Sequence, residues 1–209
     1  MPAGFPVNRP DVRVVTLADP PAAVVDGRTV VGGVSFNFIA RHQAQNAAAA
    51  LAVLDALGLP RPDCVDVDFS RWRGEEGELQ GGGLLINDAY NANPVSMRAA
   101  LAYLAERAGD RRRVAILGDM AELGRTAPAY HREVGEAVAE LGVDELVAVG
   151  ELARGYLDAG ARGRWTPNVH EALRVLDEVV RPGDAVLVKG SRAIGLEAVA
   201  EALLKVPAA

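Results

Sequence analysis

From residue 84 to residue 204, short apolar runs alternate with longer segments whose apolar residues recur at helical spacing. The apolar runs predict strands at Leu84–Ile86, Arg113–Leu117, Glu145–Val149, Arg164–Thr166 and Ala185–Val188. The segments between and after them predict helices at Pro94–Ala108, Pro128–Leu141, Leu152–Ala159, Val169–Val180 and Leu196–Leu204. This alternation favours an α/β fold, a doubly wound, Rossmann-like, mostly parallel sheet with helices on both faces.

The residues before this part are less regular. Val12–Leu17 predicts a strand, and Ala22–Val31 predicts a hairpin because two β-branched runs flank an Asp-Gly pair. Ser35–Ile39 predicts another strand, and the Ala- and Leu-rich stretch from Arg41 to about Leu57 predicts a helix. Gly81-Gly82-Gly83 predicts a tight turn before the strand at Leu84; it is no phosphate loop, since no Gly-Lys-Ser/Thr follows.

Composition excludes several classes of protein. The chain has 209 residues, half of them hydrophobic, which suffices for one domain or one domain plus a smaller piece. Its net charge of −6 argues against nucleic-acid binding, and no apolar stretch is long enough to span a membrane. The single cysteine, Cys64, suits a reducing compartment and is expected to be a small core residue. We therefore expect a cytoplasmic monomer without nucleic-acid or membrane partners.

The sequence predicts no metal ligands, since no set of side chains has the spacing of a metal site. Asp63, Asp66 and Asp68 lack the glycine and the distal glutamate of an EF-hand loop, so we interpret them as a solvated face. His131, near the start of a predicted helix, is expected to be a surface or capping residue, and His170 to be solvated. Neither a nucleophile elbow nor a dinucleotide glycine fingerprint occurs.

Three loops that follow predicted strands carry polar side chains suited to binding. In a parallel sheet such loops share one edge, where ligands bind. The first reads NDAYNANP, with Asn93 as the predicted N-cap and Pro94 as the first helical residue. The second reads GDMAELG, and the third, KGSRAIG, gathers cations and a hydroxyl that suit a carboxylate or phosphate. Two structural alternatives stay open: Asx-rich loops also cap helices, and Lys189 is also consistent with a surface lysine.

Taken together, these motifs resemble the C-terminal domain of the Mur ligases. INDAYNANP, ILGDMAELG with HREVGE, VAVGE and PGDAVLVKGSRAIGLE stand in the family's order, and ARHQAQNAAAALAV resembles the end of its central ATP-binding domain. The likeness covers residues from about Ala40 to Leu204. It implies the tail of a central domain at residues 1–76 and a C-terminal domain at 77–209. It also implies a short helix at Pro60–Phe69, which we favour over the strand suggested by alternating Val and Asp residues.

The resemblance is greatest to the branch that adds D-alanyl-D-alanine (D-Ala-D-Ala) to a UDP-N-acetylmuramoyl tripeptide during peptidoglycan synthesis. It implies that ATP phosphorylates the tripeptide carboxylate and that the dipeptide amine attacks the acyl phosphate, chemistry that Mg²⁺ and cationic side chains support. By position, it implies ATP contacts from Gln43, Asn46, Arg73, Asp88, Tyr90, Asn91 and Asn93. It implies peptide contacts from Asp119, Glu122, Lys189, Ser191 and Arg192. No residue is assigned a catalytic role.

The sequence departs from the family's pattern in two ways. Ala40 replaces a glycine and Gln43 an asparagine in the stretch that would contact adenine. The family's phosphate loop, its Mg²⁺ ligands and its domain for the UDP group have no counterpart in these residues. We therefore expect the C-terminal portion of a ligase, inactive alone and binding neither ATP nor Mg²⁺ tightly. The alternatives are a non-catalytic module that binds D-Ala-D-Ala or a muropeptide, and a generic α/β nucleotide-binding domain, which the missing glycine fingerprint disfavours.

Overall fold

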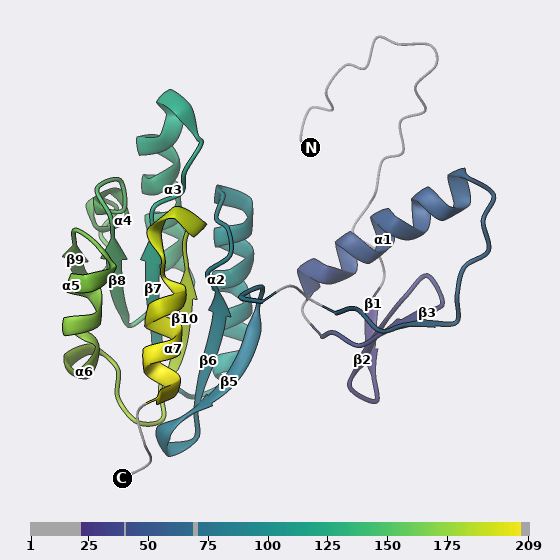
Figure 1. Ribbon diagram of the computed structural model, residues 1–209, viewed down its shortest axis with the longest axis horizontal. Coiled ribbons are helices and arrows are strands. Elements are labelled where there is room, and N and C mark those ends of the chain that lie inside the picture. The colour runs from purple at the N-terminus through teal and green to yellow at the C-terminus, as the bar shows by residue number, and fades with distance from the viewer. Residues whose placement is uncertain (1–21, 40, 69–70, 206–209) are drawn as a thin grey trace. The chain divides into compact units, whose positions relative to one another are not determined.

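The computed structural model describes residues 22–39, 41–68 and 71–205, and the chain divides into an N-terminal unit, Met1–Asp68, and a C-terminal unit, Phe69–Ala209. The N-terminal unit contains a four-stranded sheet and one helix (Figure 1): β1 (Ala22–Val25), β2 (Arg28–Val31), β3 (Val34–Phe36), α1 (Arg41–Ala56) and β4 (Cys64–Val65). The strand expected at Val12–Leu17 lies outside the described residues.

The predicted hairpin is confirmed, because β1 and β2 pair antiparallel around Asp26 and Gly27. Both turn residues have positive φ, 49° and 75°, as the right-handed twist of a two-residue hairpin requires. Gly27 has no side chain to strain in this region, and aspartate tolerates it better than most residues do. The Asp-Gly pair therefore sets the register of the first two strands.

The prediction of a short helix at Pro60–Phe69 is wrong for residues 60–68, the part of that stretch that the structure describes. Cys64 and Val65 instead form β4, parallel to β3. The Asn37 side chain then holds the Val67 backbone, since its Nδ2 donates to the Val67 carbonyl (3.1 Å) and its Oδ1 accepts from the Val67 N–H (2.7 Å). These partners satisfy backbone groups that a helix would otherwise pair internally. Cys64 is exposed, which corrects the expectation of a core residue.

The C-terminal unit is built on a six-stranded sheet with the strand order β5-β6-β10-β7-β8-β9. Its edge strand β5 runs antiparallel to β6, and the short 3₁₀ turn η1 joins them at the three glycines; every other pair is parallel. The predicted mostly parallel sheet is confirmed. The bounds are β5 (Glu75–Leu79), η1 (Gln80–Gly82), β6 (Gly83–Asp88), β7 (Arg113–Gly118), β8 (Glu145–Val149), β9 (Gly163–Thr166) and β10 (Ala185–Lys189).

Helices cover both faces of this sheet (Figure 1). One face carries α2 (Pro94–Ala108), α3 (Ala127–Glu140) and α4 (Arg154–Asp158), and the other carries α5 (Val169–Arg174), α6 (Leu176–Val179) and α7 (Glu197–Lys205). The short 3₁₀ turns η2 (Gly124–Thr126) and η3 (Arg192–Ile194) precede α3 and α7. The helix expected at Val169–Val180 is divided at Val175, whose N–H donates to Ala172 three residues back, as in a 3₁₀ turn. Within the described ranges, no helix has the length and apolarity to cross a membrane.

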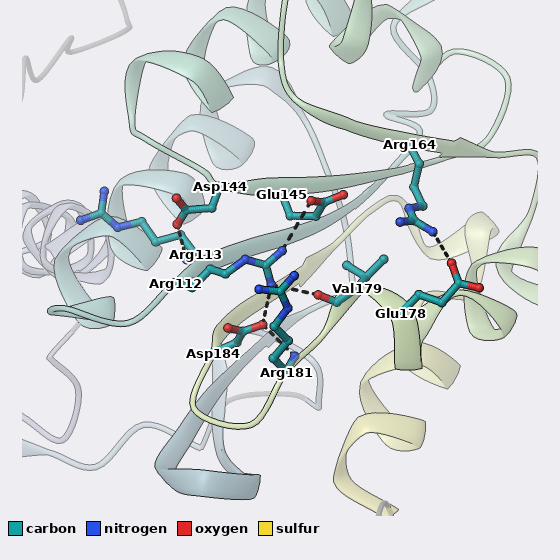
Figure 2. A network of polar contacts seen from close by, with 9 residues as sticks. All are labelled: Arg112, Arg113, Asp144, Glu145, Arg164, Glu178, Val179, Arg181 and Asp184. Atoms are coloured by element: carbon teal, nitrogen blue, oxygen red, sulfur yellow. Dashed lines mark hydrogen bonds and ion pairs between the residues drawn. The ribbon is translucent and has the colours of Figure 1, made fainter.

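A partly buried ionic network fixes the amino-terminal ends of β7, β8 and β10 (Figure 2). Arg112 Nη1 donates to the Asp184 carboxylate and to the Val179 carbonyl, both at 2.9 Å. The same carboxylate accepts from the Arg181 N–H (2.8 Å), and Arg112 Nη2 lies 3.5 Å from Glu145. These side chains serve the fold at this edge of the sheet. The polar loops that follow the strands lie at the opposite edge.

Candidate functional site

Strand register places three polar loops side by side at the carboxyl edge of the sheet. β10 lies between β6 and β7, and its last residue, Lys189, pairs with Asp88 on one side and Leu117 on the other. The loops that begin after these strands therefore start at the same level. Ligands of open parallel sheets bind at such an edge. We call this region, residues 88–93, 118–124 and 189–195, the carboxyl-edge site.

Lys189 joins two of these loops. Its ammonium Nζ lies 2.6 Å from Asp88 Oδ2 and donates to the Asn91 carbonyl at 2.8 Å. Only 2% of the residue is exposed, which excludes the alternative of a surface lysine. A buried ammonium is stable only when charge and hydrogen-bond partners compensate its lost hydration, and these two oxygens do so. Lys189 thus holds the loop after β6 against the end of β10.

Arginine side chains and aromatic rings alternate beside this pair. Arg73 lies 3.9 Å from the centre of the Tyr90 ring, and Arg192 lies 5.6 Å from Tyr90 and 4.9 Å from Trp72. Arg71 lies 5.4 Å from the centre of the Trp72 ring. The backbone carbonyl of Trp72 accepts from the Tyr90 N–H (3.1 Å). We call Arg71, Trp72, Arg73, Tyr90 and Arg192 the cation–aromatic cluster. Each guanidinium gains from the negative face of a ring, and each ring limits the rotamers of its arginine.

The guanidinium groups of this cluster face aromatic rings rather than carboxylates. Seven arginines among the described residues form ion pairs with carboxylates: Arg28, Arg61, Arg98, Arg107, Arg112, Arg164 and Arg174. Within residues 71–205, no carboxylate forms an ion pair with any of the three cluster arginines, although the chain carries a net charge of −6. Uncompensated guanidinium groups of this kind suit carboxylates and phosphates. Trp72 was not predicted as a site residue, since no sequence pattern marks it.

The loop after β7 is tied to the loop after β10 through backbone groups and the Ser191 hydroxyl. Ser191 N–H donates to the Asp119 carbonyl (3.0 Å), and Ser191 Oγ accepts from the Ala121 N–H (2.8 Å). The Asp119 carboxylate accepts from the Ala153 N–H at 2.6 Å. Asp119 and Ser191, both predicted to contact peptide, therefore use these polar atoms within the fold. Glu122 is exposed and has a φ of 64°, a conformation that non-glycine residues rarely adopt.

The asparagines of the loop after β6 serve local structure. Asn93 is the N-cap of α2, and its side chain and that of Ser96 form a reciprocal capping box at 2.8 and 3.0 Å. The Asn91 side chain accepts from the Ala92 N–H (2.8 Å). The alternative that Asx residues here cap a helix is therefore correct for Asn93. Tyr90, from the same loop, lies in the cation–aromatic cluster. Asp88, the last residue of β6, lies against Lys189.

Two predicted ATP contacts belong to the N-terminal unit. Gln43 and Asn46 lie one turn apart on α1, where Asn46 Nδ2 donates to Gln43 Oε1 at 3.0 Å. The pair thus presents amide groups on one side of the helix. The other candidates all lie in the C-terminal unit, where the sheet register brings most of them to the carboxyl-edge site.

His131 is not the surface or capping residue expected from the sequence, because it is completely buried. α3 turns it toward Tyr156 on α4, and the two rings stack with centroids 5.1 Å apart. Burial, aided by the charge of Asp119, raises the pKa of Tyr156 well above its ordinary value. Within the described ranges, no three His, Cys, Asp or Glu side chains are grouped as a metal site requires.

Comparison with known proteins gives consistent matches. Residues 73–192 match the family described as "Mur ligase, glutamate ligase domain". The UDP-N-acetylmuramoyl-tripeptide–D-alanyl-D-alanine ligase of Mycobacterium tuberculosis is 39% identical over 192 residues, which cover 78% of this chain and 38% of the relative. The crystal structure of MurF from Acinetobacter baumannii superposes with a TM-score of 0.72 at 29% identity, covering 85% of this chain and 41% of that one.

A MurF structure from Thermotoga maritima, determined with ADP, has a TM-score of 0.68 at 24% identity. The match covers 88% of this chain and 45% of that one, and it bears on the fold alone. This chain thus spans less than half the length of each of these relatives.

Proposed function

This chain belongs to the Mur ligase family, and on that basis we propose that it supplies the C-terminal part of an ATP-dependent ligase that adds D-Ala-D-Ala to a UDP-N-acetylmuramoyl tripeptide. The name of the 39% identical relative from M. tuberculosis supports both the reaction and the substrates. The proposal includes a monomer in the cytoplasm, with residues 1–76 as the tail of a central domain and 77–209 as the C-terminal domain. The alternative of a non-catalytic binding module is not favoured, because the relatives are ligases.

The observation that carries this proposal is the convergence of three loops at the carboxyl-edge site, beside three arginines that form no ion pair with a carboxylate within residues 71–205. Transfer of a phosphoryl group to a carboxylate brings several negative charges together, and fixed cations lower the energy of that arrangement. Guanidinium groups stacked on rings are already oriented, so less side-chain entropy is lost on binding. The site therefore offers charge and rigidity where such a reaction needs them.

We assign each candidate residue either a contact role or a supporting role, guided by the hydrogen bonds that its polar groups form within the fold. We propose that Arg73 and Tyr90 contact the nucleotide, with Asp88 beside them, and that Gln43 and Asn46 contact its adenine. Arg192 and Glu122, both exposed, are proposed to contact the peptide substrates. We propose that four residues, whose polar groups already bind within the fold, hold these contacts in place: Asn93, Asp119, Lys189 and Ser191. The Asn91 carbonyl belongs with them, since it accepts from Lys189.

The proposed nucleotide is ATP with Mg²⁺, and this chain's arginines would face its phosphates. One guanidinium group can donate two parallel hydrogen bonds to two oxygens of a phosphate. Arg73 and Arg192 are exposed, so their N–H groups are accessible for such bonds. The chain's own contribution would be to bind and orient anionic groups. We expect no tight binding of ATP or Mg²⁺ by these 209 residues alone, since attraction of phosphates to three exposed arginines is screened by salt.

A grafting experiment tests this function. Residues 71–209 would replace the corresponding part of the M. tuberculosis ligase, and phosphate release would be measured with ATP, tripeptide substrate and D-Ala-D-Ala. We expect dipeptide-dependent release, which Arg192→Ala lowers at least about 100-fold, while Arg174→Ala, paired on the surface with Glu171, leaves it unchanged. A folded graft that binds nucleotide but releases no phosphate would contradict the proposal.

The 209-residue chain itself provides a second measurement. With ATP and both substrates it should release no phosphate. Dipeptide-dependent release would show that the chain is active alone, and that our expectation of inactivity is wrong. Tight binding of D-Ala-D-Ala in a calorimetric titration without nucleotide would instead favour the non-catalytic module.

A further inference from the structure

His131 lies beneath the loop that follows β7 and contacts its backbone. Nε2 of the buried ring is 3.0 Å from the Met120 backbone nitrogen, which donates to it. On the other side of the ring, Nδ1 lies 2.7 Å from the carbonyl oxygen of Ala127 in the first turn of α3. A single side chain thus joins the start of a helix to a loop of the carboxyl-edge site.

These two partners fix the protonation of the ring. A carbonyl oxygen only accepts, so Nδ1 must carry the proton, and a backbone N–H only donates, so Nε2 must present its lone pair. The neutral ring protonated at Nδ1 satisfies both groups. An imidazolium, or the other neutral tautomer, would point an N–H of the ring at the N–H of Met120 and leave a buried donor without an acceptor.

Tyr156 fixes the other end of the same short segment. Its ring stacks on His131, and its hydroxyl donates to the Gly118 carbonyl at 2.8 Å. The rings reach this position because α3 and α4 approach closely at two glycines. A side chain at Gly135 would collide with the Tyr156 backbone, and one at Gly155 would come within 3.1 Å of the His131 Cβ. Gly135 and Gly155 therefore allow α3 and α4 to approach closely where the rings of His131 and Tyr156 stack.

The loop held by these rings continues into the binding loops. Its Asp119 carbonyl accepts from the Ser191 N–H, and its Ala121 N–H donates to Ser191 Oγ. The next residue after Ser191 is Arg192 of the cation–aromatic cluster. A shift of Met120 would therefore act on Arg192 through two hydrogen bonds and one peptide unit, without any contact between His131 and a substrate.

We propose that His131, as a neutral imidazole protonated at Nδ1, is a positioning residue that sets residues 118–122 and, through Ser191, the place of Arg192. Its consequence for catalysis rests on the proposed ligase function, but its structural part does not. Loss of the Nε2 acceptor frees the Met120 N–H and loosens the loop. Loss of the Nδ1 donor alone has a smaller effect, because the Ala127 carbonyl lies in the first turn of α3 and retains its place in the helix ladder.

Nitrogen NMR of the 209-residue chain tests the tautomer. Two-bond ¹H–¹⁵N correlations distinguish a protonated from a bare ring nitrogen. The chain has three histidines, so His170→Gln and His42→Gln assign the spectrum, and exposed His170 serves as the reference. At pH 7 we expect His131 to show a protonated Nδ1 and a bare Nε2. A proton on Nε2, in either the neutral or the charged ring, would overturn the proposal.

Two substitutions separate the two ring nitrogens. In His131→Gln the side-chain oxygen reaches the place of Nε2 and still accepts from Met120, whereas the shorter amide of His131→Asn reaches only the place of Nδ1. We expect the protection of the Met120 amide against hydrogen exchange to fall about tenfold or more in His131→Asn, and by less than about threefold in His131→Gln. Equal loss of protection in both folded variants would overturn the proposal.

The grafted ligase tests the consequence for activity. We expect His131→Asn to raise the KM for D-Ala-D-Ala or lower kcat by about tenfold or more, and His131→Gln to restore most of the loss. A graft that is inactive even with His131 would contradict the proposed function alone, because the NMR and exchange results do not depend on activity. Full activity in His131→Asn, with Met120 deprotected, would overturn the positioning role.

Discussion

Lys189 Nζ lies 2.6 Å from Asp88 Oδ2, and the two residues are paired in register at the carboxyl ends of neighbouring parallel strands. The pair is asymmetric, because 2% of the lysine side chain is exposed but 23% of the aspartate side chain is. Water therefore reaches the carboxylate more readily than the ammonium. The lysine depends on its partners, Asp88 and the Asn91 carbonyl, more than Asp88 depends on the lysine.

This asymmetry predicts unequal costs for removing each partner. Asp88→Asn leaves a buried ammonium without a counter-charge, and we expect the free energy of unfolding to fall by about 3–5 kcal/mol. Lys189→Met keeps the length of the side chain and leaves a carboxylate that water can reach, so a fall of about 1–3 kcal/mol is expected. Urea unfolding of both variants measures the difference. A larger cost for Lys189→Met would show that the carboxylate is the dependent partner.

The network at the opposite edge predicts a large effect without a change in the binding loops. Asp184, with 4% of its side chain exposed, accepts from Arg112 and from the Arg181 N–H. Asp184→Ala removes this shared acceptor, which frees the Arg181 N–H and leaves Arg112 with the Val179 carbonyl and Glu145. We expect a loss of about 3–5 kcal/mol in urea unfolding. The surface pair Arg98–Glu140 provides the control, and Arg98→Ala should cost about 0–1 kcal/mol. Similar costs at the two sites would contradict the structural role of Asp184.

Much of the C-terminal unit follows from sequence because its signals are local. Asn93 and Pro94 fix the start of α2, and the predicted N-cap is present, with a capping box to Ser96 that was not predicted from the sequence. The glycines before Leu84 form the expected turn, and the apolar runs correspond to β6, β7, β8, β9 and β10. Strand order was not predicted, because it depends on which strands meet after the chain has crossed the sheet. It is this order that places β10 between β6 and β7 and so assembles the carboxyl-edge site.

What sequence reasoning missed depends on contacts between distant residues. A lone histidine carries no periodic signal of burial, and His131 becomes buried because α4 supplies Tyr156 from 25 positions further along the chain. Trp72 lies in a charged stretch, and it belongs to the cluster because its ring contacts Arg192, which is remote in sequence. At Pro60–Asp68, Asn37 supplies the backbone partners that make an extended chain possible. In each case the deciding partner is a tertiary one.

Glu76 predicts a pH dependence of stability. Hydrogen bonds from Arg107 (2.8 and 2.7 Å) lower the pKa of the Glu76 carboxyl below its ordinary value of 4.5; burial opposes this shift, and the Tyr103 hydroxyl (2.6 Å) adds to it. A depressed folded-state pKa gives stability that is present above about pH 4.5 and is lost as the pH falls through the folded value. Urea unfolding between pH 6 and pH 3 should therefore show a shallower decline for Glu76→Gln than for the wild type.

An intermediate decline is expected for Tyr103→Phe, since that variant removes one donor and leaves Arg107 in place. Parallel pH curves for the wild type and Glu76→Gln would show that the carboxylate contributes nothing to the acid sensitivity of the fold.

The cation–aromatic cluster predicts weak, salt-sensitive anion binding by the C-terminal unit, with a tryptophan inside the site to report it. Trp72 faces Arg71 and Arg192, so an anion that draws Arg192 off the ring changes the surroundings of the indole. With Trp165→Phe removing the other tryptophan, titration with inorganic tripolyphosphate should change Trp72 fluorescence. Arg192→Ala or Arg73→Ala should weaken binding by about tenfold or more, the scale of one charge-assisted hydrogen bond.

Two controls distinguish anion binding at this cluster from general attraction of anions to positive charge: a change of ionic strength and the substitution of an arginine outside the cluster. Raising the ionic strength from about 0.01 M to 0.15 M shortens the Debye length from about 30 Å to about 8 Å, so binding at exposed arginines should weaken markedly. Arg174→Ala removes the same charge from α5, away from the cluster, and should leave the titration unchanged. If Arg174→Ala and Arg192→Ala weakened binding equally, the anion would be responding to net charge, and the oriented guanidinium groups would have no special part in holding it.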